Sequence, residues 1–76
     1  MNYNRLKEDE PMDKIGENIK YLRQQRHWSQ AQLAAKLHVT RQALSYYENG
    51  DRFPNLYIAC QLADIFDVTI DSLIGR

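Results

Sequence analysis

The sequence has few of the features that mark secreted or membrane-spanning proteins. It has one cysteine, Cys60, among 76 residues, so no disulfide can form within the chain and a reducing compartment is expected. No apolar run approaches the length of a membrane span, and the first residues include no apolar segment of signal-peptide length. These absences argue against a disulfide-stapled scaffold and against a membrane protein. They predict a soluble, cytoplasmic protein.

The chain also has no excess of charge of either sign. Ten basic and ten acidic residues give zero net charge, which taken alone argues against a nucleic-acid binder. The charges are unevenly distributed, however. Residues 13–52 carry seven basic and four acidic residues, a net charge of +3, whereas residues 53–76 carry one basic and three acidic residues, a net charge of −2. A phosphate-facing side within the first of these segments is therefore compatible with the composition.

Helical spacing of apolar residues and capping residues divide most of the chain into short helices. Residues 1–12 are polar and aperiodic and are predicted to form a flexible arm, which leaves residues 13–76 as the folded domain. The patterns predict helices at about 13–26, 30–37, 41–49 and 56–66, and a short one ending near residue 75. Only the segment VTIDSLI fits a strand, and a single strand has no partner. The predicted fold is all-α.

Particular residues support these helix boundaries. Ser29 followed by Gln32 has the spacing of a capping box, Thr40 is a candidate cap for the helix 41–49, and Gly50 ends that helix. Asp13 is the candidate cap of the first helix. The stripe predicted to be buried on the helix 56–66 consists of Leu56, Ala59, Leu62, Ala63 and Phe66.

The helix 41–49 separates into an apolar face and a polar face. At about 100° per residue, Ala43, Leu44 and Tyr47 cluster toward the core. The opposite arc carries long or hydrogen-bonding side chains and no aliphatic residue: Arg41, Gln42, Ser45, Tyr46 and Asn49. An arginine fork matches the O6/N7 pair of guanine, and a glutamine amide can match the N6/N7 pair of adenine. This helix is thus a candidate for reading bases in the major groove.

The connection before this helix strengthens the interpretation. Only His38, Val39 and Thr40 join it to the helix 30–37, which is too short for the two helices to lie side by side. A steep crossing, as in a helix-turn-helix, is expected instead. Such a crossing needs a small residue where the backbones approach, and Ala34 is placed for that role.

These features together resemble the Cro/C1-type (Xre-type) helix-turn-helix family. The resemblance covers residues 15–74, and its landmarks are SQAQLA, Leu44 and Tyr47, the ENG turn, Pro54 and the closing DVTIDSLI. It implies a compact five-helix, lambda-repressor-like domain that binds double-stranded DNA sequence-specifically, as a transcriptional regulator and a repressor. Small repressors of this type act as dimers on pseudo-palindromic operators, with half-sites about 34 Å apart.

The resemblance also assigns roles to individual residues. In this family, base edges are read at the positions of Thr40, Arg41, Gln42, Ser45 and Tyr46. DNA phosphates are bound at the positions of Ser29, Gln30, Asn49 and Arg52. Arg23 and Glu48 match an ion pair that ties the first helix to the third.

The sequence departs from the family pattern at two turns. His27 and His38 occupy positions where the family commonly has glycine, and both are predicted to have positive φ at some conformational cost. Tyr46 is bulky for a base-reading residue, so the operator preference of a relative does not transfer to this chain.

Dimerisation is predicted through the last two helices. Beyond the expected core stripe, they carry surplus apolar residues on a small domain: Tyr57, Ile58, Ile65, Ile70 and Ile74.

Other functions were weighed against DNA binding. Cys60 is far in sequence from either histidine and is expected to be a packed thiol. The sequence has no CxxC or HxxxH spacing of metal ligands. No serine or cysteine has the flanking glycines of a nucleophile elbow. No metal, cofactor, catalytic residue or membrane contact is therefore expected, and the protein is not predicted to be an enzyme. The alternatives are a protein-interaction module with the same fold, which net neutrality favours, and an antitoxin-like regulator; Arg41 and Gln42 favour DNA.

Overall fold

The computed structural model describes residues 14–75, and all regular structure within them is helical. The helices follow one another as α2 (Ile15–Gln25), α3 (Gln30–Leu37), α4 (Arg41–Asn49), α5 (Leu56–Phe66) and α6 (Ile70–Ile74). The predicted all-α fold is confirmed, and the ends predicted for α3, α4 and α5 agree with the structure. The predicted flexible arm at residues 1–12 lies outside the described residues. Within those residues, no helix is both long enough and apolar enough to span a membrane.

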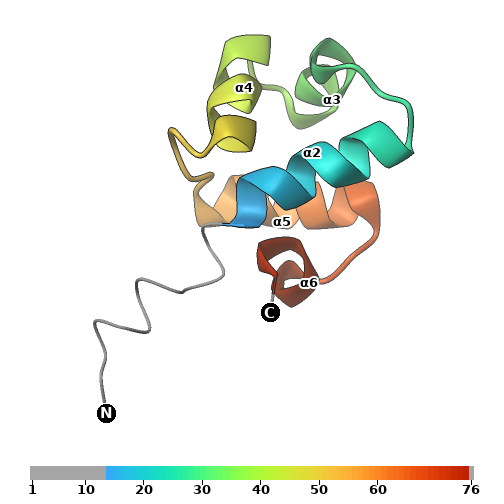
Figure 1. Ribbon diagram of the computed structural model, residues 1–76, viewed down its shortest axis with the longest axis vertical. Helices are drawn as coiled ribbons and strands as arrows, with labels where there is room; N and C mark the ends of the chain where they lie inside the picture. Colours follow the sequence, from blue (N-terminus) through green and yellow to red (C-terminus); the bar gives the residue numbers. More distant parts are fainter. Residues whose placement is uncertain (1–13, 76) are drawn as a thin grey trace.

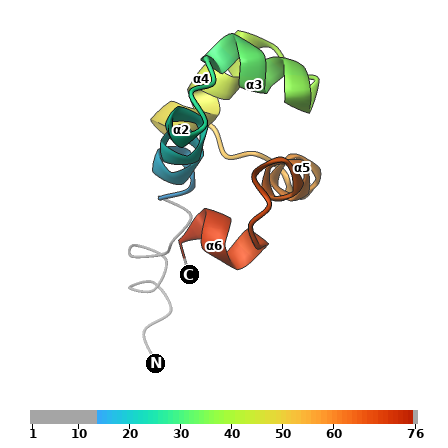
Figure 2. The same cartoon turned by 90° about the vertical axis from the view of Figure 1, so that its right-hand side faces the viewer.

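The helices are arranged so that α3 and α4 form one end of the domain. α6 lies at the opposite end, with α2 and α5 between the two ends, as the two perpendicular views show (Figure 1, Figure 2). The core is built from all five helices, and its fully buried large side chains are Phe66, Ile15, Ile19, Leu33, Leu44, Leu62 and Leu73. Leu33 and Leu44 anchor α3 and α4 to this core, so the outer faces of these two helices point away from it.

Hydrogen bonds at the helix starts account for the agreement of the boundaries. The Ser29 hydroxyl accepts a bond from the Gln32 backbone N–H at 3.0 Å, and the Gln32 side chain accepts one from the Ser29 N–H at 2.7 Å. The capping box predicted for α3 is therefore present. Thr40 caps α4 by accepting from the Ala43 N–H at 3.0 Å. Each cap satisfies a backbone donor that has no partner within its own helix.

The first helix differs from the prediction at its start. α2 begins at Ile15, with Lys14 rather than Asp13 at the N-cap position, and the Lys14 side chain makes no capping bond. The start of α2 therefore lacks the side-chain cap that marks the starts of α3 and α4, which is why the sequence placed its beginning less accurately.

The two histidine turns have the predicted backbone conformation. His27 has φ of 58° and His38 has φ of 61°, both in the left-handed region. His38 ends α3 there, and its N–H donates to the Ala35 carbonyl at 3.2 Å. A short turn of this kind allows α4 to leave α3 at a steep angle, at the conformational cost of a side chain at positive φ.

The buried stripe of α5 agrees with the prediction at Ala59, Leu62, Ala63 and Phe66 and differs from it only at its start. Leu56 was expected in the core but is 74% exposed, whereas Ile58 was expected outside the core and is buried. The two residues are separated by about 200° around a helix, so they cannot face the same side. Cys60 is related to Ile58 by the same rotation and is exposed, not packed as predicted. The buried stripe therefore starts at Ile58 and leaves the first turn of α5 with apolar side chains in solvent.

Candidate nucleic-acid interface

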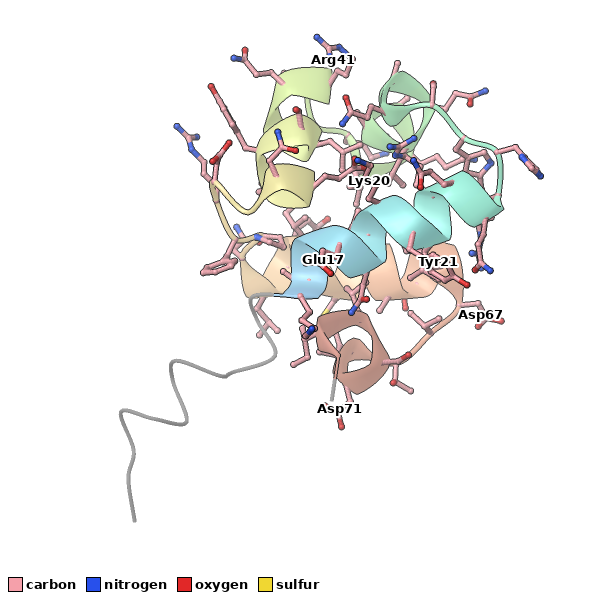
Figure 3. The ribbon with its side chains drawn as sticks, viewed as in Figure 1. Glu17, Lys20, Tyr21, Arg41, Asp67 and Asp71 are labelled. Atoms are coloured by element: carbon pink, nitrogen blue, oxygen red, sulfur yellow. The ribbon has the colours of Figure 1, made fainter. Side chains whose placement is uncertain are left out.

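The polar face of α4 lies on the outside of the domain. Leu44 is fully buried beneath the helix, while Arg41 and Gln42 are exposed. Figure 3 shows Arg41 at the outer edge of the α3–α4 end of the domain. The sequence-derived division of α4 into a core face and a polar face therefore holds in the structure.

The opposite end of the domain carries negative charge. Asp71 projects from α6 at the edge farthest from Arg41, and Asp67 lies near the α5–α6 turn (Figure 3). Since these two carboxylates, which repel a polyanion, lie away from Arg41, the α3–α4 end is the more favourable of the two ends for a polyanion to approach.

Three of the predicted DNA-contacting residues form one cluster. The Gln42 amide donates to the Tyr46 hydroxyl at 3.0 Å, and the Arg52 guanidinium lies over the Tyr46 ring, 4.8 Å from its centroid. The backbone N–H groups of Asp51 and Arg52 donate to the Tyr46 carbonyl at 3.0 Å and 3.3 Å. Tyr46 therefore holds the loop after α4 in a fixed place beside the helix. Besides this bond, the Gln42 amide has a second N–H and a carbonyl oxygen, so it can both donate and accept further hydrogen bonds.

Other residues predicted to contact DNA make hydrogen bonds only within their own helix or at its start. Asn49 donates to the Ser45 hydroxyl at 3.5 Å, one turn apart on the outer face of α4. Ser29 and Thr40 cap α3 and α4, so each places its hydroxyl at a helix N-terminus, where backbone N–H groups and the helix dipole favour anions.

The buried edge of α4 contains an ion pair with α2. The Arg23 Nε donates to the Glu48 Oε2 at 2.6 Å and the Arg23 Nη2 to the Glu48 Oε1 at 3.1 Å, while the Arg23 Nη1 donates to the Trp28 carbonyl at 2.8 Å. The structure thus brings together the two residues that the family resemblance paired. A bidentate guanidinium–carboxylate contact holds α4 at a defined position on α2.

Gln30 has a role that the sequence did not reveal. Its side-chain Nε2 donates to the Glu48 Oε1 at 3.0 Å, and its Oε1 accepts from the Arg41 Nη1 at 3.4 Å. The residue was predicted to bind phosphate, and the structure places its amide between the buried ion pair and the first residue of α4. No local sequence pattern signals this contact, because Gln30 and Glu48 belong to different helices and are 18 residues apart.

Comparisons with known proteins agree with this arrangement. A sequence profile of the helix-turn-helix family matches residues 19–73. The HTH-type transcriptional regulator AnsR of Bacillus subtilis (strain 168) is 40% identical over 55 residues, which are 72% of this chain and 47% of the relative. The HTH-type transcriptional activator BcrR of Enterococcus faecalis is 36% identical over 61 residues, 80% of this chain and 30% of the relative.

A further relative is the uncharacterized HTH-type transcriptional regulator YqaE of Bacillus subtilis (strain 168). It is 38% identical over 60 residues, which are 79% of this chain and 52% of the relative. The chain thus spans about half the length of these curated relatives, or less. No solved structure matches it.

The segment matched by the profile runs from α2 into α6 and contains the whole α3–turn–α4 unit. The chain therefore belongs to the Cro/C1-type helix-turn-helix family.

Proposed function

We propose that this chain is a DNA-binding transcriptional regulator that places α4 in the major groove of duplex DNA. The observation that carries the proposal is the outer face of α4, where exposed polar side chains are held on a helix anchored by the buried Leu44. The relatives are named transcriptional regulators, which supports the same function. No catalytic residue is part of the proposal.

Repression is the mode of regulation that we propose. A domain that occupies an operator blocks other proteins from the same DNA, and this outcome requires no further contact. The relative BcrR is named an activator. A reporter gene controlled by the operator distinguishes the two modes, since deletion of a repressor raises expression and deletion of an activator lowers it.

Two groups of residues have different roles in this proposal. Base edges are read by Thr40, Arg41, Gln42, Ser45 and Tyr46, all at the start or on the outer side of α4. Phosphates are bound around them by Ser29, Gln30, Asn49 and Arg52. The Gln42–Tyr46–Arg52 cluster links the two groups, because the ring of a base-reading residue supports a phosphate-binding guanidinium.

The roles are tested by selecting binding sites from a pool of random duplexes at defined salt concentrations. Arg41→Ala or Gln42→Ala is expected to relax the preference at one or two base pairs, by about 1–3 kcal/mol of discrimination each. Arg52→Ala is expected to weaken binding to all sequences alike and to lower the salt slope by about one.

Lys14→Ala is the matched control for the loss of one positive charge. Its side chain lies beside Gly75, directly after α6, and not on the outer face of α4, so its removal is expected to change neither selection nor salt slope. Identical selection profiles for Arg41→Ala and Arg52→Ala would contradict the division of roles.

We further propose that the chain binds a two-fold operator as a homodimer, paired through the start of α5. Ile65, Ile70 and Ile74, which the sequence suggested for this contact, pack against the core. Tyr57, which the sequence also suggested, is 68% exposed, and Phe53 and Leu56 beside it in the sequence are 51% and 74% exposed. They follow the loop from α4 directly, so a partner bound there would lie next to the DNA-reading end. Exposed aromatic and aliphatic side chains at one place on a small domain are typical of a protein contact.

A Leu56→Asp/Tyr57→Asp variant tests this contact. Sedimentation is expected to show a shift to monomer, and operator affinity is expected to fall by about a hundredfold, because the second half-site no longer binds intramolecularly. The helical circular dichroism should be unchanged, since both side chains are exposed. Tyr21→Asp on α2, also an exposed tyrosine, is the control and should remain dimeric. A dimer that survives the double substitution would place the interface elsewhere.

A further inference from the structure

Two polar side chains donate hydrogen bonds from the α2 segment to the ends of α5 and α6. The Arg26 Nη2 donates to the Phe66 carbonyl at 2.7 Å, and the Asn18 Nδ2 donates to the Leu73 carbonyl at 2.8 Å. Both carbonyls lie in the last turn of their helices, where carbonyl groups have no partner within the helix. Both donors are half-buried, so water competes less for these bonds than at the surface. We refer to the two contacts as the α2 bridges.

Aromatic rings surround the first of the α2 bridges. The rings of Trp28 and Phe66 are stacked, with centroids 5.9 Å apart and planes at 21°. The Arg26 guanidinium lies 5.1 Å from the centroid of the Phe66 ring and 5.9 Å from that of the Trp28 ring. Its Nη1 also donates to the Leu22 carbonyl at 3.4 Å, in the last turn of α2. Arg26 is therefore held by several contacts and fastens the end of α2 to the end of α5.

The α2 bridges hold helices that are connected to the α3–α4 end by a loop. Residues 50–55 join α4 to α5, and Figure 2 shows this loop as the segment that leads from one helix across to the other. Apolar packing has no preferred direction, whereas a hydrogen bond requires a defined distance and angle. The loop determines where α5 begins, and the Arg26 bridge determines where it ends. Together they set the direction of α5 relative to α2, which the buried ion pair ties to α4.

We propose that Arg26 and Asn18 are positioning residues that set the spacing between the two half-sites of the operator. They do so by fixing the start of α5, with its dimer contact, relative to α4. The inference rests on the proposed function, since it needs a base-reading α4 and a dimer paired through Leu56 and Tyr57. In a two-fold dimer, a rotation of α5 relative to α4 occurs in both subunits, so it changes the distance and the angle between the two α4 helices twice over.

Operator spacing is a sensitive measure of that geometry. One base pair more or less moves a half-site by about 3.4 Å along the duplex and by about a tenth of a turn around it. A purely structural role predicts something else, because a loss of folded protein lowers binding to every duplex alike. A changed dimer geometry lowers the preference for one spacing and leaves binding to a single half-site intact.

The variant Asn18→Leu/Arg26→Met removes both α2 bridges, because each replacement keeps about the length of the side chain and loses its donors. Binding is measured on duplexes whose two half-sites are separated by spacers that differ by one base pair. The unaltered chain is expected to bind the best spacer about tenfold more tightly than its neighbours, and the variant should lose at least about threefold of this preference. Thermal unfolding establishes that the variant is folded at the temperature of the assay. If it is not, Arg26→Met alone is used, and the same outcomes decide.

Gln24→Leu/Lys36→Met is the matched control, because it also removes one amide and one positive charge. Gln24 is exposed on α2, and Lys36 is exposed on α3, with its ammonium group 4.6 Å from the centroid of the Trp28 ring. The control should keep the full spacing preference, and both double variants should bind a single half-site equally within about twofold. Full spacing preference in the folded variant without the α2 bridges, or an equal loss on single and paired half-sites, would overturn the proposal.

Residual dipolar couplings, measured by NMR without DNA, separate this inference from the proposed function. They report the orientation of α5 relative to α4 within one subunit. Loss of the α2 bridges should change this orientation or reduce the couplings of α5 through motion, whereas the control should match the unaltered chain. Unchanged couplings would overturn the role of the bridges even if the chain binds DNA as a dimer. Changed couplings in a chain that neither pairs through α5 nor binds DNA would mean that the proposed function fails, and the role in spacing with it, while the bridges orient α5.

Discussion

Glu48→Ala is expected to lower the free energy of unfolding by about 3–5 kcal/mol, a large part of the total stability of a small domain. The Glu48 side chain is 1% exposed and that of Arg23 is 11% exposed, so the substitution leaves a buried guanidinium without its counter-charge. Two of the three hydrogen bonds of Arg23 disappear with the carboxylate, and only the bond to the Trp28 carbonyl remains. Urea unfolding followed by helical circular dichroism measures the loss.

Two further variants identify the cause of that loss. Glu17→Ala removes an exposed carboxylate from α2 and is expected to change the stability by less than about 0.5 kcal/mol. The variant Arg23→Met/Glu48→Met is expected to recover most of the stability that Glu48→Ala loses, because no unpaired charge stays buried. A loss below about 1 kcal/mol for Glu48→Ala would mean that water reaches the guanidinium and that the pair is not buried in solution.

Features that depend on neighbouring residues in the sequence could be predicted. The starts of α3 and α4 follow from Ser29 and Thr40, whose side chains bond to backbone N–H groups three residues later. The end of α3 follows from His38, whose positive φ is required by the short turn. Local chemistry decides each of these, so the sequence contains the necessary information.

Features that depend on packing between helices could not be predicted in the same way. Leu56 and Ile58 are both apolar, and only the position of α5 against the rest of the core decides which of them is buried. The contact of Gln30 with Glu48 depends on the angle between α3 and α4 and on one rotamer of each side chain. The outer face of α4 was easier to predict, because a whole arc without aliphatic residues cannot form a core.

Gly16 is the clearest case of a residue whose importance becomes visible only in the packed structure. A glycine inside a helix normally lowers stability by about 0.5–1 kcal/mol relative to alanine, so the sequence suggests that Gly16→Ala would stabilise α2. In the structure, however, a Cβ at this position would lie 2.5 Å from the Tyr47 carbonyl oxygen and 2.7 Å from that of Glu48. Both atoms belong to the backbone of α4, so no side-chain rotation relieves the contact.

Gly16→Ala is therefore expected to lower the free energy of unfolding by about 1–3 kcal/mol or more, opposite in sign to its effect on an isolated helix. The companion variant Ala35→Gly, at an exposed position of α3, measures the effect of helix propensity alone. It replaces alanine by glycine and is expected to lower the free energy of unfolding by about 0.5–1 kcal/mol. To accommodate the methyl group, α4 must move away from α2, which displaces together the side chains that we propose to read bases. Operator affinity should fall at temperatures where the variant remains folded, with the loss spread over all base pairs that α4 reads. A more stable protein after Gly16→Ala would mean that α2 and α4 lie farther apart than these distances require.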